Sequence, residues 1–353
     1  MTGTKLYIYK KERVFIMKRF LKAFAAVVAL GISAVMLTAC GSSSSSSSEN
    51  STGQSGSSDT SSSTVLRIAA QPFPLYTPVF VAYDLGYLDE EFEKVGAEFT
   101  WQLFNSGPLV NEAVAAGEAD MGFMADLPAI IAKSTGQPIE IVSNVAYGEK
   151  GLAVLVQADS DIKSVAELKG KKVAYATGSY AQHLLALLLS NEGLSLDDVE
   201  TINLGAGDSP AALAAGEVDA IVIWEQFISK LTSDGTAKVL ADGTGVKKGN
   251  MITYFVSDYA DAHPEVVKAY ITALNRADEY IQNDPKAAAE LVAADFSIDS
   301  ELMEQIIPKF TYKTALDADD IAEITKVKDF SLDAGIISND VDMDSFINTS
   351  YLD

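Results

Sequence analysis

The chain has 353 residues, of which 48% are apolar, and it carries 26 basic against 49 acidic side chains for a formal net charge of −23. This length and apolar content allow two domains with hydrophobic cores of their own. The acidic balance disfavours a nucleic-acid partner, because neutralising phosphates requires a basic face.

The first 39 residues are typical of a secretory signal. From Met17, the expected translation start, a basic segment precedes an apolar run that ends at Leu37 and is too short and one-sided for a comfortable membrane span. The following "LTAC" and Gly41 resemble the lipobox of bacterial lipoproteins, which would make Cys40 the lipidated first residue of the mature protein. The alternative interpretation is that Cys40 is a small residue near an ordinary cleavage site and is not lipidated. Cys40 is the only cysteine, so an internal disulfide is excluded.

A serine-rich segment follows this cysteine. Serine provides 14 of the 23 residues from Ser42 to Thr64, without an aliphatic or aromatic residue, which is typical of a flexible linker. We therefore expect residues 40–64 to tether a soluble folded part, beginning near Val65, to the extracytoplasmic face of the cell membrane. Without residues 1–39 the chain carries 19 basic and 48 acidic residues, a formal charge of −29.

Strands and helices alternate after Val65. We predict strands at 66–71, 97–104 and 119–124, and helices from Thr77 to Tyr87, from Ser106 to Gly117 and over 127–136. The same plan then recurs, with strands at 171–176, 199–204 and 217–224 and helices over 180–193 and 208–216. Short turns between alternating elements favour an α/β fold around a mostly parallel sheet.

Two segments, 111–128 and 209–227, share one pattern: a helix ends at a glycine, an acidic pair follows, and a buried strand leads to a turn. Two lobes of similar architecture would leave a cleft between them, where the carboxyl ends of strands collect ligands. From Met251 a strand is followed by mainly helical sequence to about Ala334, which suggests a return to the first lobe.

These residues resemble the solute-binding lipoproteins of bacterial ABC importers, in the branch for nitrate, taurine and aliphatic sulfonates. The most specific elements are "ELKGKKVA" (167–174), which leads into a Gly-Ser helix start, and the paired "AAGE-D" strands (115–120 and 214–219). The resemblance covers 65–353 and implies a two-lobed periplasmic-binding-protein-like fold (type II) with two crossovers and a helical C-terminal region on the first lobe. Lobe 1 would comprise 65–152 and 251–353, and lobe 2 would comprise 153–250.

The helix start after Gly178 and Ser179 is the first candidate binding site. Open N–H groups and the positive end of the helix dipole suit sulfonate, nitrate, phosphate or carboxylate. In the family, a second hydroxyl residue, Ala and His commonly follow the Gly-Ser pair, whereas Tyr180 and Gln182 replace the hydroxyl residue and the His here. These replacements retain the backbone donors of the helix start, but they leave the identity of the solute open. The alternative is an N-cap that serves only its own helix.

Two carboxylates end equivalent strands. If Asp126 and Glu225 both face the cleft, the solute carries an amine or other donor as well as an acid group. The alternatives are an N-cap before Pro128 for Asp126 and a solvated rim carboxylate for Glu225. Phe73, Tyr76 and Trp224, at strand ends and in loops, would form apolar walls of the cleft. The alternative is that these aromatic side chains belong to the hydrophobic core. The complete set of candidate ligand-binding residues is Phe73, Tyr76, Ser106, Gly107, Asp126, Gly178, Ser179, Tyr180, Gln182, Trp224 and Glu225.

The sequence shows no motif typical of catalysis, metal binding or nucleotide hydrolysis. His183 and His263 have no metal-ligand spacing, Ser179 has no recognisable base nearby, and no phosphate loop of a nucleotide hydrolase occurs. We therefore expect no catalysis, cofactor or metal. The expected function is a monomeric receptor that captures a small sulfonate-like or taurine-like anion for an ABC permease and its ATPase. The alternatives are a binder of a heterocyclic vitamin precursor such as a thiamine pyrimidine, an enzyme on the same fold, and a lipoprotein that reports solute to a sensor kinase.

Overall fold

The computed structural model describes residues 64–352. The signal segment, the lipobox cysteine Cys40 and the serine-rich linker up to residue 63 lie outside these residues. Among residues 64–352 no helix combines the length and the apolarity that a membrane span requires.

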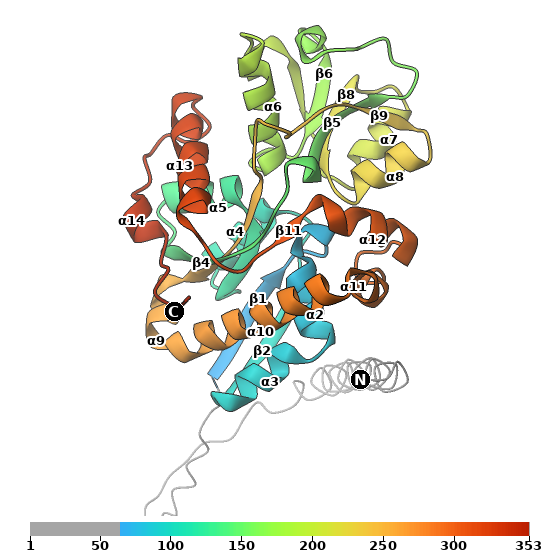
Figure 1. Cartoon of the computed structure of the whole chain (residues 1–353). Helices are drawn as coiled ribbons and strands as arrows, with labels where there is room; N and C mark the ends of the chain where they lie inside the picture. The colour runs from blue at the N-terminus through green and yellow to red at the C-terminus, as the bar shows by residue number, and fades with distance from the viewer. Residues whose placement is uncertain (1–63, 353) are drawn as a thin grey trace, which may run out of the picture. The chain divides into compact units, whose positions relative to one another are not determined.

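The strands form two sheets, each the centre of one lobe (Figure 1). The part built on the six-stranded sheet is called lobe 1, and its strand order is β11-β4-β10-β3-β1-β2. The part built on the five-stranded sheet is called lobe 2, with the order β7-β6-β8-β5-β9. Lobe 1 contains β1 (Thr64–Ala70), β2 (Ala97–Leu103), β3 (Met121–Ala125), β4 (Ile139–Tyr147), β10 (Asn250–Val256) and β11 (Thr311–Tyr312). Lobe 2 contains β5 (Leu152–Gln157), β6 (Lys172–Tyr175), β7 (Glu200–Asn203), β8 (Ala220–Trp224) and β9 (Ala237–Asp242).

Both sheets are mixed, so the expectation of a mostly parallel sheet is wrong. The pairs β1–β2, β1–β3, β6–β7 and β6–β8 are parallel, whereas β10 is antiparallel to both of its neighbours and β5 to both of its own. The reason is the passage between the lobes. The chain leaves lobe 1 along β4 and returns along β10, and a leaving strand and a returning strand paired in one sheet run in opposite directions.

Helices cover the sheets. Around lobe 1 lie α2 (Thr77–Asp84), α3 (Tyr87–Lys94), α4 (Gly107–Ala115), α5 (Asp126–Ser134), α9 (Ser257–Ala262), α10 (Pro264–Asn283), α11 (Pro285–Val292) and α14 (Met343–Phe346). Lobe 2 carries α6 (Tyr180–Asn191), α7 (Ser209–Ala214) and α8 (Phe227–Ser233). Short 3-10 helices are η1 (Pro74–Tyr76), η2 (Glu149–Gly151), η3 (Val165–Leu168), η4 (Leu196–Asp198) and η5 (Ile307–Lys309). Helix α10 packs against α2 and α3 on lobe 1.

The single helix expected from Thr77 to Tyr87 is two helices. Helix α2 ends at Asp84, and Gly86, with a φ of 76°, turns the chain so that α3 begins at Tyr87. A positive φ of this size strains any residue with a Cβ atom, which is why the break falls at a glycine.

The two passages between the lobes lie against each other. The N–H of Gly148 in the outgoing passage donates to the carbonyl of Lys248 at 3.1 Å, and the N–H of Gly243 in the returning passage donates to the carbonyl of Glu149 at 3.0 Å. A Cβ atom on Gly148 would lie 2.4 Å from a backbone oxygen, and one on Gly151 would lie 2.4 Å from the ring of Phe310. The two passages, which together are called the hinge, are therefore packed too closely for side chains at these glycines.

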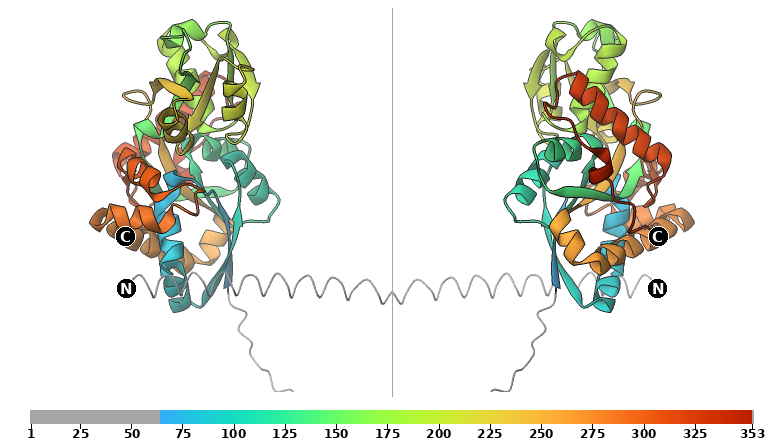
Figure 2. Two further views of the ribbon diagram at one scale, coloured as in Figure 1. Left: turned by 90° about the vertical axis from the view of Figure 1, so that its right-hand side faces the viewer. Right: turned by 90° about the vertical axis from the view of Figure 1, so that its left-hand side faces the viewer.

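The C-terminal region contacts both lobes. Strand β11 pairs with β4, and α13 (Ala318–Asp333) packs against α5 and β10 of lobe 1. Helix α12 (Ser300–Ile306) packs against α8 of lobe 2. Figure 2 shows α13 along one side of the protein, next to the α6 region. The helical C-terminal region was expected on lobe 1, and it contacts lobe 2 as well.

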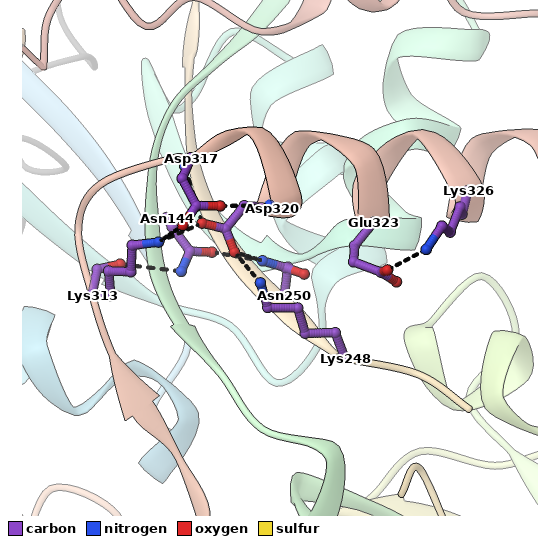
Figure 3. Close-up of polar contacts among 8 residues, drawn as sticks. All are labelled: Asn144, Lys248, Asn250, Lys313, Asp317, Asp320, Glu323 and Lys326. Carbon is purple, nitrogen blue, oxygen red and sulfur yellow. Dashed lines mark hydrogen bonds and ion pairs between the residues drawn. The ribbon is translucent and has the colours of Figure 1, made fainter. Parts of the chain in front are cut away.

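A buried carboxylate fixes the start of α13 (Figure 3). Asp320 is fully buried and accepts hydrogen bonds from Lys248 Nζ at 2.6 Å, from Lys313 Nζ at 2.9 Å and from Asn250 Nδ2 at 3.1 Å. These partners belong to the returning passage, to the segment after β11 and to β10. Asp320 therefore ties the last long helix to the central strand of lobe 1.

Candidate functional site

A small cavity lies between the lobes. Its volume is about 20 Å³, and it is lined from lobe 1 by Gln71, Phe73, Leu75, Tyr76, Gly107, Ala125 and Pro128, and from lobe 2 by Tyr180 and Trp224. A cavity needs roughly 10–15 Å³ to hold one water molecule, so this space suits about one water. A larger solute can enter only when the lobes move apart.

Trp224, at the end of β8, forms the lobe 2 wall of this cavity. Phe73 lies edge-on to the indole at 5.6 Å between ring centroids, and Tyr180 lies tilted against it at 5.8 Å. The indole Nε1 is buried and has no hydrogen-bond partner among residues 64–352. An indole nitrogen can only donate a hydrogen bond, so Trp224 keeps a donor for which residues 64–352 provide no acceptor.

The start of α4 forms part of the lobe 1 wall. Ser106 is its N-cap residue in an extended conformation, and Gly107 is the first helical residue and lines the cavity. First-turn N–H groups have no acceptor within a helix, and the dipole favours negative charge at this end. A Cβ atom on Gly107 would lie 2.7 Å from the ring of Pro128, so the glycine allows α4 to approach α5 closely.

The start of α6, where we expected open donors, is occupied by the protein's own acceptors. The N–H of Gly178 donates to Gln182 Oε1 at 2.8 Å, and the N–H of Ser179 donates to the carbonyl of Ala176 at 3.1 Å. Ser179 Oγ accepts from the N–H of Ala181 at 3.3 Å, which makes it the N-cap of α6. The expectation of free donors is wrong at these positions. A role for Gly178, Ser179 and Gln182 in solute binding stays a prediction.

Asp126 does not line the interlobe cavity, because it is held by a buried lysine. Its two oxygens accept from Lys247 Nζ at 2.9 and 2.7 Å, and the same Nζ lies 2.9 Å from Nδ1 of His183. Each of these three residues is at most 4% exposed. Asp126 belongs to lobe 1, His183 to lobe 2 and Lys247 to the returning passage. The cluster therefore bridges the lobes at the hinge.

Burial sets the protonation of this bridge. Burial lowers the pKa of Lys247, against the opposing effect of Asp126, and burial together with the charge of Lys247 holds the pKa of His183 well below its ordinary value. A neutral His183 that accepts from Lys247 at Nδ1 carries its proton on Nε2. This Nε2 is buried and has no partner in the described part of the chain.

Glu225 also has its own lysine. It is fully buried, accepts from the N–H of Ser229 at 3.1 Å and from Ser229 Oγ at 3.0 Å, and forms an ion pair with Lys309. Lys309 lies in η5, next to β11 of lobe 1, so this pair also joins the lobes. Neither Asp126 nor Glu225 lines the cavity, and each carboxylate is neutralised by a lysine. The arrangement that would bind a solute amine between the two acids is not present.

Sequence reasoning missed the two bridging lysines. Lys247 pairs with a residue 121 positions earlier, and Lys309 pairs with one 84 positions earlier. The only available signal was the pair Lys247-Lys248 between two glycines in an otherwise acidic chain, whereas Lys309 follows a proline without any periodic pattern. Gln71, Leu75, Ala125 and Pro128 of the cavity wall were missed as well. Among residues 64–352 no group of three or more His, Cys, Asp or Glu side chains could hold a metal ion.

This chain is similar in sequence to one described protein family and to several individual proteins. The family described as NMT1/THI5 like matches residues 74–288. A putative aliphatic sulfonates-binding protein of Escherichia coli is 29% identical over 233 residues, which cover 66% of this chain and 72% of the relative. The taurine-binding periplasmic protein of Escherichia coli is 31% identical over 201 residues, which cover 55% and 62%.

Solved structures agree in fold. The alkanesulfonate-binding protein SsuA from Xanthomonas axonopodis pv. citri bound to MOPS superimposes with a TM-score of 0.74 at 28% identity, covering 81% of this chain and 98% of that one.

An enzyme is also similar to this chain in sequence. A 4-amino-5-hydroxymethyl-2-methylpyrimidine phosphate synthase from Aspergillus parasiticus is 26% identical over 231 residues, which cover 62% of this chain and 66% of the enzyme.

Proposed function

The chain belongs to the NMT1/THI5-like family, and we propose that it is an extracytoplasmic solute-binding protein that captures an organic sulfonate between its lobes for an ABC permease. Its similarity to sulfonate-binding and taurine-binding proteins supports the solute class, and the similarity to a periplasmic protein supports the location. We propose binding and delivery, without a chemical reaction.

The observation that carries the proposal is the pairing of a free donor with an aromatic wall. Trp224 lines a cavity that also meets the start of α4, and its buried indole N–H has no hydrogen-bond partner among residues 64–352. A sulfonate presents three negatively charged acceptor oxygens, which suit an N–H donor and a helix N-terminus. Its hydrocarbon part suits the rings of Phe73 and Tyr180.

The two neutralised carboxylates decide between kinds of sulfonate. An amine on the solute gains most from an unpaired carboxylate in the site, because desolvating an ammonium without a partner is costly. Asp126 and Glu225 are paired with Lys247 and Lys309. We therefore propose a plain alkanesulfonate as the solute, in preference to a taurine-like zwitterion.

Capture would proceed by hinge closure about the two passages. The lobes must separate to admit a solute, since the cavity of about 20 Å³ is too small for a sulfonate in this arrangement. A solute that contacts Trp224 of lobe 2 and Gly107 of lobe 1 favours the closed arrangement by its differential affinity. The ion pair between Lys309 and Glu225 is one further contact between the lobes in this arrangement.

The test is a calorimetric titration of the purified protein with ethanesulfonate and taurine. Trp224→Phe keeps the ring wall and removes the N–H, and we expect it to weaken ethanesulfonate binding by about 1.5–3 kcal/mol, the scale of a hydrogen bond to a charged group. The matched control is Trp101→Phe, because Trp101 stacks on Tyr83 and does not line the cavity. Unchanged affinity in Trp224→Phe, or tighter binding of taurine than of ethanesulfonate, would contradict the proposal.

The similarity to the fungal synthase favours a second candidate, a binder of a pyrimidine precursor of a vitamin. The aromatic wall formed by Trp224 and Tyr180 suits a heterocycle as well as an alkyl chain. Adding 4-amino-5-hydroxymethyl-2-methylpyrimidine to the same titration separates the two. Tighter binding of the pyrimidine than of ethanesulfonate would replace the sulfonate proposal, and recovery of unchanged ligand by NMR would support binding without catalysis.

We also propose that the protein is held on the membrane through a lipid on Cys40. The lipobox sequence and the serine-rich linker support this anchor. A single modified cysteine at the end of a flexible linker leaves the lobes free to open and close at the permease.

A further inference from the structure

Two aromatic side chains form the lobe 2 wall of the interlobe cavity within the described residues, those of Trp224 and Tyr180. Trp224 belongs to β8, where its backbone pairs with Leu152 of β5. Tyr180 is the first residue of α6, and 5% of its surface remains exposed. The indole is therefore part of a sheet, whereas the phenol belongs to the end of a helix that reaches the cavity.

The chain around Tyr180 fixes this residue at the cleft. Ser179 caps α6 by accepting a hydrogen bond from the N–H of Ala181 at 3.3 Å. A Cβ atom on Gly178 would lie 3.5 Å from the ring of Pro108 in α4, so the residues just before α6 lie directly against lobe 1. The first turn of α6 is thus held against the opposite lobe in this arrangement, and Tyr180 is held with it.

The phenol of Tyr180 extends from the lobe 2 wall to the hinge. Its ring lies tilted against the indole of Trp224 at 5.8 Å, and its hydroxyl donates a long hydrogen bond of 3.4 Å to the carbonyl of Gly151. Burial raises the pKa of Tyr180 well above its ordinary value, and the nearby hydroxyl of Tyr76 and the carboxylates that follow β3 and β8 raise it further. The phenol therefore stays neutral, and its surroundings are unfavourable for an anion.

Two other rings of the cavity wall also pack against rings outside the cavity. Phe73 contacts the ring of Phe227 at 6.5 Å, and Tyr76 contacts the ring of Phe123 at 4.9 Å, but neither Phe227 nor Phe123 lines the cavity. The ring contact of Tyr180 in the described part of the chain is with a residue of the wall itself. The space that the Tyr180 ring occupies is therefore continuous with the cavity.

We propose that Tyr180 limits the length of the hydrocarbon chain that the solute can carry, an inference that rests on the proposed function. There the sulfonate lies at the start of α4 and at Trp224, and the hydrocarbon part extends toward the Tyr180 ring. A cavity of about 20 Å³ has no room beyond this ring, and adding methylenes to a filled site is unfavourable. Tyr180 thus selects methanesulfonate and ethanesulfonate over longer alkanesulfonates.

The experiment is a calorimetric titration of the purified protein with methane-, ethane-, butane- and hexanesulfonate. The parent should bind hexanesulfonate at least tenfold more weakly than ethanesulfonate. Tyr180→Ala should reverse this order, with hexanesulfonate at least tenfold tighter than ethanesulfonate. The physical reason is that each methylene buried in the space left by the ring strengthens binding about fourfold, which corresponds to about 0.8 kcal/mol per CH₂.

Three variants separate chain length from other effects of the substitution. Tyr180→Phe keeps the ring and should keep the parent order. Tyr180→Leu fills part of the space, so butanesulfonate should bind most tightly, and this variant also serves if Tyr180→Ala does not fold. The matched control is Tyr175→Ala, at the end of β6 in the same lobe. Tyr175 is also 5% exposed but does not line the cavity, so this variant should keep the parent order.

Failure of this inference differs from failure of the proposed function. If the parent binds ethanesulfonate but binds hexanesulfonate equally well, or if Tyr180→Ala and Tyr180→Leu keep the parent order, Tyr180 does not limit chain length, and the proposed function stands. A reversal in Tyr175→Ala as well would also overturn the role of Tyr180. Absence of binding by all four sulfonates, in the parent and in every variant, would overturn the proposed function and this inference with it.

Discussion

Replacing Lys247 by methionine should destabilise the folded protein by about 3–5 kcal/mol, the cost of removing one partner of a buried ion pair. The Asp126 carboxylate is 1% exposed, and both of its oxygens accept from Lys247 Nζ, at 2.9 and 2.7 Å. Methionine fills a similar volume but donates no hydrogen bond. The variant therefore leaves a carboxylate buried without a counter-charge, and it leaves Nδ1 of His183 without its donor.

Two further variants isolate the charge effect. The double variant Asp126→Asn with Lys247→Met carries no uncompensated charge, so we expect it to recover most of the lost stability. Lys286→Met removes a lysine that is 67% exposed and paired with Glu304 at 3.2 Å, and it should leave the unfolding midpoint close to that of the parent, because an exposed ion pair adds little stability. Urea unfolding followed by circular dichroism gives the midpoints and slopes for all of them. If Lys247→Met loses no more stability than Lys286→Met, the buried bridge does not hold the hinge as described.

Three other outcomes are expected. The pKa of His183 is held well below its ordinary value, so as the pH falls below about 6.5 only the unfolded chain gains this proton. Stability should then fall by up to about 1.4 kcal/mol per pH unit from this group, and His183→Gln should flatten the dependence measured by urea unfolding. Ser179→Ala removes the N-cap of α6 and should cost about 1 kcal/mol of stability, measured by urea unfolding. Cys40→Ala should move the protein from the membrane fraction to the soluble fraction on immunoblots; a variant that stays membrane-bound would rule out the lipid anchor.

Local patterns in the sequence were sufficient where an element is set by its own residues. The helix from Tyr180 and the fully buried strand β8 follow from apolar spacing and flanking glycines. Strands β4, β5 and β9 were not identified. Strands β4 and β5 are buried along almost their whole length and so show no alternation, whereas only the first residue of β9 is buried. Their direction, which makes both sheets mixed, depends on which lobe the chain enters next, and this information is not local.

The candidate site shows the same division. Phe73, Tyr76, Gly107, Tyr180 and Trp224 were placed at the ends of strands and helices, and the structure brings all five to one cavity. The roles of the two carboxylates could not be foreseen, because each depends on a lysine far away in the chain. An acidic side chain at a strand end looks the same in sequence whether a solute or a lysine neutralises it.

The position of β10 between β3 and β4 has a consequence for how the protein is synthesised. Lobe 2 occupies one continuous stretch of chain from β5 to β9, whereas the lobe 1 sheet has a gap at its centre until residues 250–256 have left the ribosome. Non-local pairing of this kind is slow and leaves strand edges exposed. We expect lobe 2 to fold first on the nascent chain. Chains halted after Asp242 should contain a protease-resistant lobe 2 beside a digestible lobe 1, and chains halted beyond Val256 should protect both.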